Sequence, residues 1–352
     1  MKQVKNILAA AALLALPIAF TSCEDVLGHW EKPVPATPAP EGSIENPYKI
    51  ASSADWEAIA AKVNAGDGNI HIKQTADLSG ITTVIGTEEN PFKGTYDGQG
   101  YAISDINITG ENNLGLFGYV SSPDAVIENV VVTSGTVSGT GRSYGAIVGT
   151  LHEGKIDHCV NYANITSSYT STEAGARIGG IVGWMYGDNT AVNTVTDCIN
   201  FGNITATGPN GSYAGGITGC MGVDTHGLGD HLDNCQNYGT ITTTYGSGIG
   251  GIVGWLYAVT SDPFTLTNNH NGGNLVNSAT TGTRMNNVIF GGGNITNDTF
   301  NATNSNSYLS TITVKLGTAA AAAPTTDQAR GATSRTSNPA GITVGSKTYT
   351  KE

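Results

Sequence analysis

Hydrophobic and polar positions alternate along short segments of this chain, and the same pattern recurs five times between Leu114 and Asn277. Each copy opens with a glycine-rich apolar segment: Leu114–Val120, Tyr144–Leu151, Ile178–Met185, Ala214–Met221 and Ile249–Leu256. The last glycines of these segments are Gly118, Gly149, Gly183, Gly219 and Gly254, which are 31, 34, 36 and 35 residues apart. A period in this range predicts a stacked-repeat architecture, because one unit cannot bury its apolar face alone.

A second alternating segment follows each glycine-rich one, starting at Ile127, Ile156, Val195, Leu232 and Leu266. Equivalent positions of stacked coils lie about 4.8 Å apart. Asparagines therefore stack at one such position, and we expect their amides to form a structural ladder through Asn161, Asn200, Asn237 and Asn271. The cysteines of the neighbouring column, Cys159, Cys198 and Cys235, have parallel side-chain directions that disfavour disulfides, so they are interpreted as buried apolar fillers.

Strand alternation also predicts which side chains of the glycine-rich segments face outward. One parity is aliphatic or glycine and is assigned to the core, with the recurring glycine marking a close backbone approach. The other parity contains Val182 and Val253 together with an aromatic stripe that we interpret as a ligand-binding surface: Phe117, Tyr119, Trp184, Tyr186, Trp255 and Tyr257. The alternative is that the N-terminal helix or the tail after Asn301 covers this stripe.

The rest of the chain supplies caps for the stack. Residues 43–93 are predicted to form an N-terminal cap whose short helix begins near Ser52 and buries Trp56, Ile59, Ala60 and Val63. Residues 94–300 form the repeat region, and residues 301–352 are expected to be a closing segment that is partly disordered. The predicted fold is all-β, a parallel β-helix-like solenoid of about five to six coils with a short capping helix.

The N-terminus resembles that of a bacterial lipoprotein. Lys2 and Lys5 precede an apolar run that ends at Phe20, so residues 1–22 are interpreted as a signal peptide and Cys23 as the lipidated residue. The acidic pair Glu24 and Asp25 resembles an export signal for the outer face of the cell. A proline-rich linker, residues 23–42, would hold the folded part away from the membrane. The expected location is the bacterial outer membrane, exposed at the cell surface.

Charge restricts the possible partners. The formal net charge is −12 and 12% of the residues are charged, with no basic patch visible in the sequence. Because phosphate binding requires such a patch, a nucleic-acid partner is not expected.

Three of the glycine-rich segments allow a family resemblance to be named. Gly115–Gly118, Gly180–Gly183 and Gly251–Gly254 resemble the GLUG repeat of bacterial surface proteins, which include adhesins and IgA-peptidase-type proteins. Gly94–Gly100 resembles the segment that opens such arrays, and the likeness covers about residues 42–298. The resemblance implies a surface-exposed, right-handed parallel solenoid. It implies little about chemistry, because a scaffold accompanies several activities.

Candidate chemistry is sparse. The Lys and Arg residues between Gly94 and Asp298 are Arg142, Lys155, Arg177 and Arg284, and no GxSxG, HExxH or Cys/His pairing is present. The acids Asp157, Asp197 and Asp233 are interpreted as solvated turn residues. One loop contains weak metal-ligand candidates, Asp224, His226, Asp230 and His231, for which a polar turn is the preferred interpretation. No enzyme activity, cofactor or metal is therefore expected.

The sequence thus favours a membrane-anchored surface protein, an adhesin or scaffold that binds an extracellular glycan or a surface protein. Two alternatives stay open. A carbohydrate-active β-helix enzyme, a polysaccharide lyase or hydrolase, would require a cleft with converging carboxylates. A structural subunit of a surface assembly would expose a long edge strand or an uncapped end.

Overall fold

The computed structural model describes residues 38–169, 175–188, 191–207, 212–222, 229–244, 246–257, 264–280, 285–293, 300–302 and 305–351. The chain divides into a unit of residues 1–39 and a unit of residues 40–352, and the architecture below belongs to the second. Cys23 and the signal peptide lie outside the described residues. Within the described part, no helix has the length and apolar character needed to cross a membrane.

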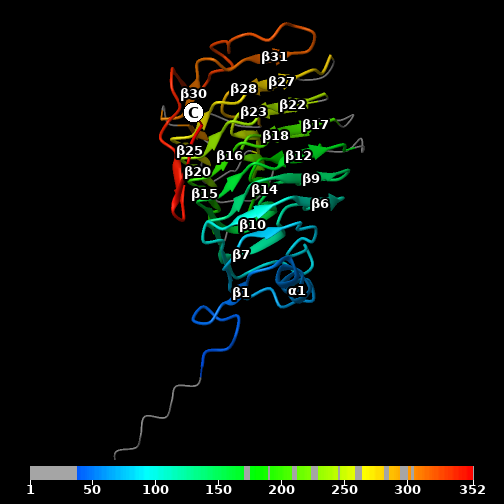
Figure 1. Ribbon diagram of the computed structural model, residues 1–352. Helices are drawn as coiled ribbons and strands as arrows, with labels where there is room; N and C mark the ends of the chain where they lie inside the picture. The colour runs from blue at the N-terminus through cyan, green and yellow to red at the C-terminus, as the bar shows by residue number, and fades with distance from the viewer. Residues whose placement is uncertain are drawn as a thin grey trace, which may run out of the picture. The chain divides into compact units, whose positions relative to one another are not determined.

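The described strands stack as parallel ladders around one core, as the repeats predict (Figure 1). Sheet A contains β1 (Tyr48–Ile50), β2 (Ile72–Gln74), β4 (Thr95–Asp97), β7 (Phe117–Glu128), β10 (Val148–Asp157), β15 (Thr194–Thr196), β20 (His231–Asp233), β25 (Phe264–Thr267) and β29 (Phe300–Ala302), with β14 (Val182–Met185), β19 (Thr218–Met221) and β24 (Val253–Leu256) branching from β10. Sheet B contains β3 (Leu78–Ser79), β5 (Ala102–Ser104), β8 (Val131–Val132), β11 (Val160–Asn161), β16 (Ile199–Asn200), β21 (Gln236–Asn237), β26 (His270–Asn271), β30 (Ser307–Leu309) and β32 (Thr333–Arg335).

Two smaller ladders and a hairpin make up the rest of the strands that the structure describes. Sheet C contains β6 (Ile106–Gly110), β9 (Gly135–Gly139), β12 (Asn164–Ser167), β17 (Ile204–Ala206), β22 (Ile241–Thr243), β27 (Leu275–Asn277) and β31 (Val314–Leu316). Sheet D contains β13 (Arg177–Gly179), β18 (Ser212–Gly215), β23 (Gly246–Gly250) and β28 (Met285–Asn287). The antiparallel C-terminal hairpin is formed by β33 (Ile342–Val344) and β34 (Lys347–Tyr349). The solenoid prediction is confirmed, and the stack continues past both ends of residues 94–300, through β3 and through β30 to β32.

Helix α1 (Ser53–Asn64) closes the N-terminal end of the stack. It begins where the hydroxyl of Ser52 accepts a hydrogen bond from the backbone N–H of Asp55, a cap that satisfies a free helix-terminal donor. Its buried face is the predicted one and includes Trp56, whose ring lies 5.8 Å from both Tyr96 and Phe117. The helix therefore covers the apolar end of the first coils, which an open solenoid would expose.

The asparagine ladder is continuous through four coils. The Nδ2 of Asn161 donates to the Oδ1 of Asn200 at 2.8 Å, Asn200 donates to Asn237 at 2.9 Å, and Asn237 donates to Asn271 at 2.8 Å. Each amide also bonds the backbone two residues further along, as Asn200 does with Gly202. All four side chains are fully buried, so the ladder satisfies polar groups that water cannot reach.

The cysteine column beside the ladder is built of free thiols. Cys159, Cys198 and Cys235 are buried, and burial raises the pKa of the Cys198 thiol well above its usual value. They therefore act as small core side chains.

The prediction that Phe117, Val182 and Val253 face outward is wrong, since all three are fully buried in the core. The chain bends at Gly180 and Ile181, between β13 and β14. Ile181 and Val182, the aliphatic residues at and after this bend, are both fully buried, so strand parity alone does not separate covered from exposed side chains here. The recurring glycine has the predicted role, because a Cβ on Gly183 would lie 2.4 Å from the backbone nitrogen of Tyr144.

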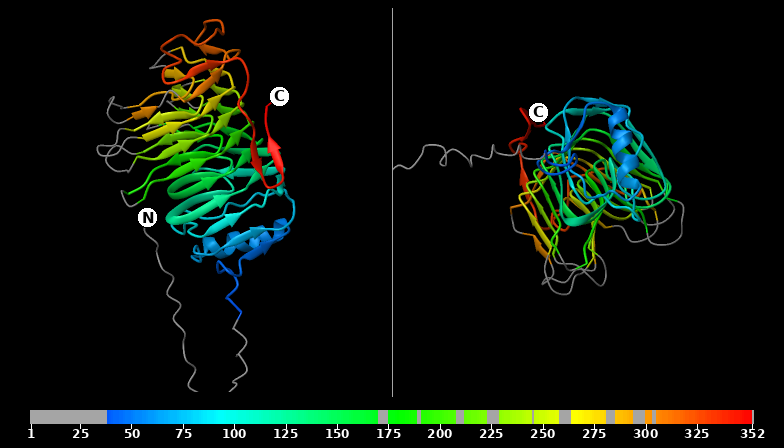
Figure 2. Two further views of the ribbon diagram at one scale, coloured as in Figure 1. Left: turned by 90° about the vertical axis from the view of Figure 1, so that its left-hand side faces the viewer. Right: turned by 90° about the horizontal axis from the view of Figure 1, so that it is seen from below.

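The C-terminal hairpin covers the outer face of sheet B. Ile342 and Val344 pack against Val131, Val160 and Ile199, and the left view of Figure 2 shows the hairpin, in red, beside the cyan coils. The side chain of Gln236 donates to the carbonyl of Ala340 at 2.9 Å. The tail thus returns along the stack and joins coils that are distant in sequence.

Candidate functional site

The predicted aromatic stripe is located at the branch strands of sheet A. In register across β7, β10, β14, β19 and β24 lie Tyr119, Thr150, Trp184, Cys220 and Trp255. Trp184 and Trp255 are therefore two strands apart, a spacing of about 10 Å. We use the name aromatic cluster for this group and its ring partners: Tyr119, Trp184, Tyr186, Tyr213, Trp255 and Tyr257.

Trp184 forms the first half of the aromatic cluster. Its indole stacks on Tyr186 with ring centroids 3.9 Å apart, and the Arg177 guanidinium lies 3.8 Å from the indole ring centroid. The indole N–H donates to the carbonyl of Gly222 at 3.1 Å. The Tyr119 and Tyr186 hydroxyls are 2.8 Å apart and share a hydrogen bond. The protein itself thus occupies the stacking positions nearest this indole.

Trp255 forms the second half. Its ring stacks on Tyr213 at 4.8 Å, and Tyr257 meets both rings edge-on at 6.3 Å. Tyr213 and Arg177 are register partners in sheet D, so this sheet supplies the side chains that lie on both indoles. The sequence interpretation missed these two residues. Each stands two residues before the double glycine of its own copy, Gly179–Gly180 or Gly215–Gly216, and this shared position was the available signal.

The residues of the predicted stripe differ in how much of each side chain is exposed to solvent. Phe117 is fully buried under α1 and therefore is not available to a ligand, and Tyr119 is 8% exposed. Trp184, Tyr186, Tyr213, Trp255 and Tyr257 are half-buried. Burial raises the pKa of the Tyr119, Tyr186 and Tyr213 hydroxyls, so these phenols stay neutral near pH 7. The cluster therefore presents neutral ring edges and hydroxyls beside one arginine.

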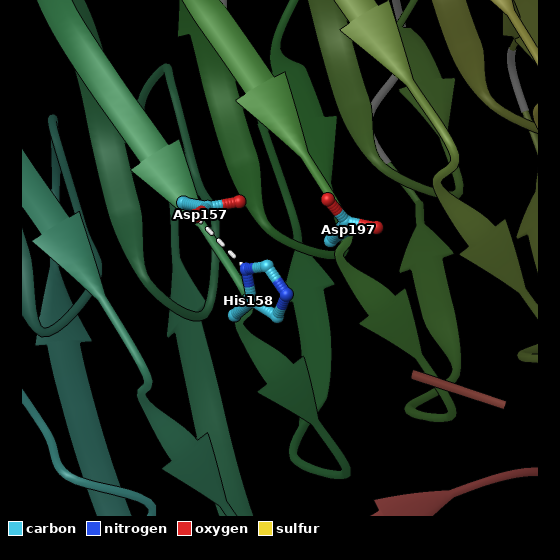
Figure 3. Close-up of side chains that lie close together, drawn as sticks. All are labelled: Asp157, His158 and Asp197. Carbon is cyan, nitrogen blue, oxygen red and sulfur yellow. Dashed lines mark ion pairs between the residues drawn. The ribbon is translucent and has the colours of Figure 1, made fainter. Parts of the chain in front are cut away.

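A second group of side chains lies at the corner between sheets A and B. Asp157, His158 and Asp197 bring one ligand atom each within 4.8 Å of one another, with the His158 ring between the two carboxylates (Figure 3). His158 Nδ1 lies 2.8 Å from Asp157 Oδ2. Each carboxylate also accepts a bond from the next coil, Asp157 from Thr196 and Asp197 from Asn234, both at 2.6 Å. These hydrogen bonds account for the closeness of the three side chains as a polar ladder along the corner. This agrees with the interpretation of Asp157 and Asp197 as turn residues.

A groove adjoins this corner. It has a volume of about 480 Å³ and is lined by Gln99, Glu128, Asn129, Asp157, His158, Thr343 and Gly345. The pKa of Glu128 is raised, first by burial and then by the charges of Asp97 and Asp157. The groove is acidic and its far wall is the C-terminal hairpin.

Two of the four weak metal-ligand candidates belong to the described residues. Asp224 and His226 lie outside them, His231 is exposed on β20, and Asp230 is 1% exposed. The Asp230 carboxylate accepts bonds from the backbone N–H and the side-chain amide of Asn193, at 3.2 and 3.0 Å. Asn193 in turn donates to the backbone carbonyl of His152. Asp230 is thus a buried structural carboxyl, and burial raises its pKa to about 7.

Replacing Asp230 with asparagine is expected to stabilise the protein above neutral pH. The folded-state pKa exceeds the unfolded value, so the stability that the protonated carboxyl contributes is present below about pH 4 and is lost as the pH rises through 7. An asparagine at this position keeps the acceptor for Asn193 without a charge, and a pKa raised from 3.8 to about 7 corresponds to roughly 4 kcal/mol. Thermal melts of both proteins between pH 4 and pH 8.5 measure the difference.

The matched control is the exposed carboxylate Asp124. Asp124→Asn should differ little from wild type in melting temperature at any pH. Burial lowers the pKa of the His270 imidazole to about 4, so the stability that His270 contributes rises between pH 4 and 6.5, opposite to the effect of Asp230. This contribution is the same in variant and wild type and cancels in their difference in stability. A difference that does not change with pH would contradict the prediction.

Comparison with known proteins supports the fold and finds two distant relatives. No protein-family model matches the chain. The chain is 29% identical to "Halomucin" of Haloquadratum walsbyi over 159 residues, 40% of this chain and 2% of halomucin. It is 28% identical to "Putative Gly-rich membrane protein" of Evansella cellulosilytica over 169 residues, 45% of this chain and 19% of that protein. The chain thus spans under a fifth of either relative.

One solved structure has a similar fold. It is described as a "putative immunoglobulin A1 protease from Bacteroides ovatus" and superposes with a TM-score of 0.66, covering 84% of this chain and 85% of its own. The sequence identity is 19%, so the similarity concerns the fold alone. The GLUG resemblance therefore rests on the motifs of the chain itself.

Proposed function

We propose that this protein is a lipid-anchored bacterial surface protein whose solenoid binds an extracellular glycan or a surface protein, with a glycan favoured. The observation that carries the proposal is the half-exposed aromatic cluster, which extends over Trp184, Tyr186, Tyr213, Trp255 and Tyr257. Solvent-accessible aromatic groups of this density usually mark an interaction site. Neutral phenol hydroxyls and ring edges suit the hydroxyl and C–H groups of a sugar.

The scaffold beneath the cluster favours binding because it is rigid. The buried asparagine ladder and the parallel register hold Trp184 and Trp255 at a fixed separation. A ligand that contacts both would lose little free energy to the ordering of loops or side chains. A repeating polymer is the natural occupant, since its own period can match a surface whose elements repeat along the stack.

A surface location is supported by the N-terminal sequence and by the relatives. The run from Lys2 to Cys23 has the layout of a lipoprotein signal, and Glu24 and Asp25 follow it. One similar protein is described as a membrane protein. We propose that Cys23 carries the lipid anchor and that the acidic pair directs export to the outer face.

Two arms of one experiment test this function. Residues 24–352 are applied to glycan and matrix-protein arrays, and simultaneous change of Trp184 and Trp255 to alanine is expected to abolish the binding seen for wild type. Tyr162→Ala is the matched control, because this tyrosine is 40% exposed and lies on the Tyr162, Phe201 and Tyr238 stack of sheet B. Equal loss of binding in the control, or full binding by the double variant, contradicts the assignment of the surface.

The second arm tests the location in intact cells. Cys23→Ala should give an unlipidated protein, and changing Glu24 and Asp25 to alanine should protect the protein from protease added outside. Release of equal fragments from wild type and from the acidic-pair variant would disprove export to the surface.

A further inference from the structure

Three polar side chains from successive coils meet beside the aromatic cluster. The Ser121 hydroxyl oxygen lies 3.0 Å from Nδ1 of His152, and Nε2 of His152 lies 3.2 Å from Oδ2 of Asp188. Ser121 is on β7, His152 is on β10 and Asp188 follows β14. A hydroxyl, an imidazole and a carboxylate connected in this order form the arrangement that activates a serine nucleophile.

The local structure places each group. The register between β7 and β10 shifts between Leu151 and Glu153, so a bulge re-aims the side chain of His152. The backbone carbonyl of His152 accepts a bond from the side-chain amide of Asn193, which the buried Asp230 orients. The imidazole packs edge-on against the Tyr186 ring with centroids 4.8 Å apart. Asn193 thus fixes the backbone of His152, and Tyr186 fixes the position of its ring.

The partners of His152 decide which of its ring nitrogens carries the proton. An ionised carboxylate only accepts, so the Asp188 contact requires a proton on Nε2 of His152. In the neutral imidazole Nδ1 then carries a lone pair, and it faces the hydroxyl of Ser121. This is the tautomer that accepts the serine proton.

A hydrogen-bond donor for a developing oxyanion lies next to these groups. Tyr119 is two residues before Ser121 on β7 and therefore projects from the same face of the strand. Its hydroxyl shares one hydrogen bond with that of Tyr186, and this bond uses only one of the two phenolic protons. Because burial keeps both phenols neutral, the second proton is available for donation.

We propose that Ser121, His152 and Asp188 form a nucleophile, base and carboxylate relay that hydrolyses acyl esters carried by the polymer bound at the aromatic cluster. The choice of an ester over an amide follows from exposure. The Asp188 side chain is 65% exposed, so water weakens the electrostatic activation that the strongly basic leaving group of an amide would need. The substrate class rests on the proposed glycan-binding function, whereas the relay itself does not.

Water is the only reactant that the reaction needs besides the ester. The Ser121 oxygen attacks the ester carbonyl carbon while its proton passes to Nδ1 of His152, and a C–O bond to Ser121 forms. The ester C–O bond then breaks, and His152 protonates the departing alcohol. Water attacks the acyl-serine with His152 as base, which releases the carboxylic acid and restores the hydroxyl of Ser121.

The test uses the full-length chain and two small probes, a fluorophosphonate that labels activated serines and p-nitrophenyl acetate. Wild type is expected to be labelled on Ser121, located by mass spectrometry, and to release nitrophenol. Ser121→Ala should abolish both signals, whereas Ser122→Ala, the adjacent serine, should keep them. His152→Gln should lower both rates on the order of 100-fold or more, the usual contribution of a general base. Asp188→Asn should produce a smaller loss.

Thermal melts and array binding of the same samples separate the outcomes. Wild-type labelling at the level of Ser121→Ala, or labelling unchanged in a folded His152→Gln variant, overturns the relay. If the relay variants lose labelling and still bind the arrayed ligand, the binding surface and the relay are both supported. If labelling is as expected but nothing binds the array, the relay stands and the proposed function and its ester-bearing polymer fail.

Discussion

Placing a methyl group on Gly183 is expected to destabilise the solenoid by about 4 kcal/mol or more, a loss that single substitutions reach only through severe packing defects. The Cβ of an alanine would lie 2.4 Å from the nitrogen of Tyr144, 2.5 Å from the oxygen of Gly149 and 2.6 Å from the carbonyl carbon of Ser143. All three are backbone atoms, which cannot rotate away as a side chain does. Relief requires moving β14 away from β10 and from the backbone of residues 143–144 in the preceding coil, which breaks contacts between the two coils.

Thermal unfolding followed by circular dichroism measures the effect, and a fall in the melting temperature of roughly 10 °C is expected for a unit of this size. Gly110→Ala is the matched control. Its Cβ would meet the end of the Leu114 side chain, which can move, so little change is expected. A Gly183→Ala protein that melts at the wild-type temperature would show that β14 does not lie as close to the backbone of the preceding coil as described.

Replacing Asn200 with leucine is expected to cost several kcal/mol. Leucine has nearly the shape of asparagine, so the change mainly removes hydrogen bonds in the middle of the ladder. The Nδ2 of Asn161, the Oδ1 of Asn237 and the carbonyl of Gly202 each lose the Asn200 amide as a partner, and the N–H of Gly202 keeps only its 3.3 Å bond to the carbonyl of Asn161. Each buried polar group left unsatisfied costs about 1–3 kcal/mol.

Denaturant unfolding of Asn200→Leu against wild type tests this expectation. Thr205→Leu is the control, because this threonine is half-exposed on the outer side of β17, in the same coil, and receives the same new side chain. If Asn200→Leu unfolds like wild type and instead loses ligand binding, the ladder is a binding site and not a structural element.

The part of the site that could be predicted from the sequence is its position in the repeat. Trp184 and Trp255 occupy equivalent places two copies apart, and the structure aligns them through Cys220. Their partners could not be assigned in the same way, because Arg177 and Tyr213 reach the indoles from a different sheet. Ser121 and His152 also carried a signal that the interpretation passed over. Each stands three residues after the recurring glycine of its copy, and they are therefore neighbours in adjacent coils.

The sequence by itself determined the features that repeat: the stacked coils, the capped helix at Ser52, the asparagine ladder and the close-packed glycines. A repeated spacing places like residues one above another, so the register of one pair implies the register of all.

The tertiary structure alone decided the features that depend on a bend or on segments without a period. Val182, which follows the bend at Gly180 and Ile181, is buried although Trp184 on the same side of the strand is half-exposed, because the neighbouring segments and not the alternation decide which side chains are covered. Similarly, the C-terminal hairpin reaches Val131 and Val160 across about half of the chain, and no periodic pattern in the sequence encodes that contact.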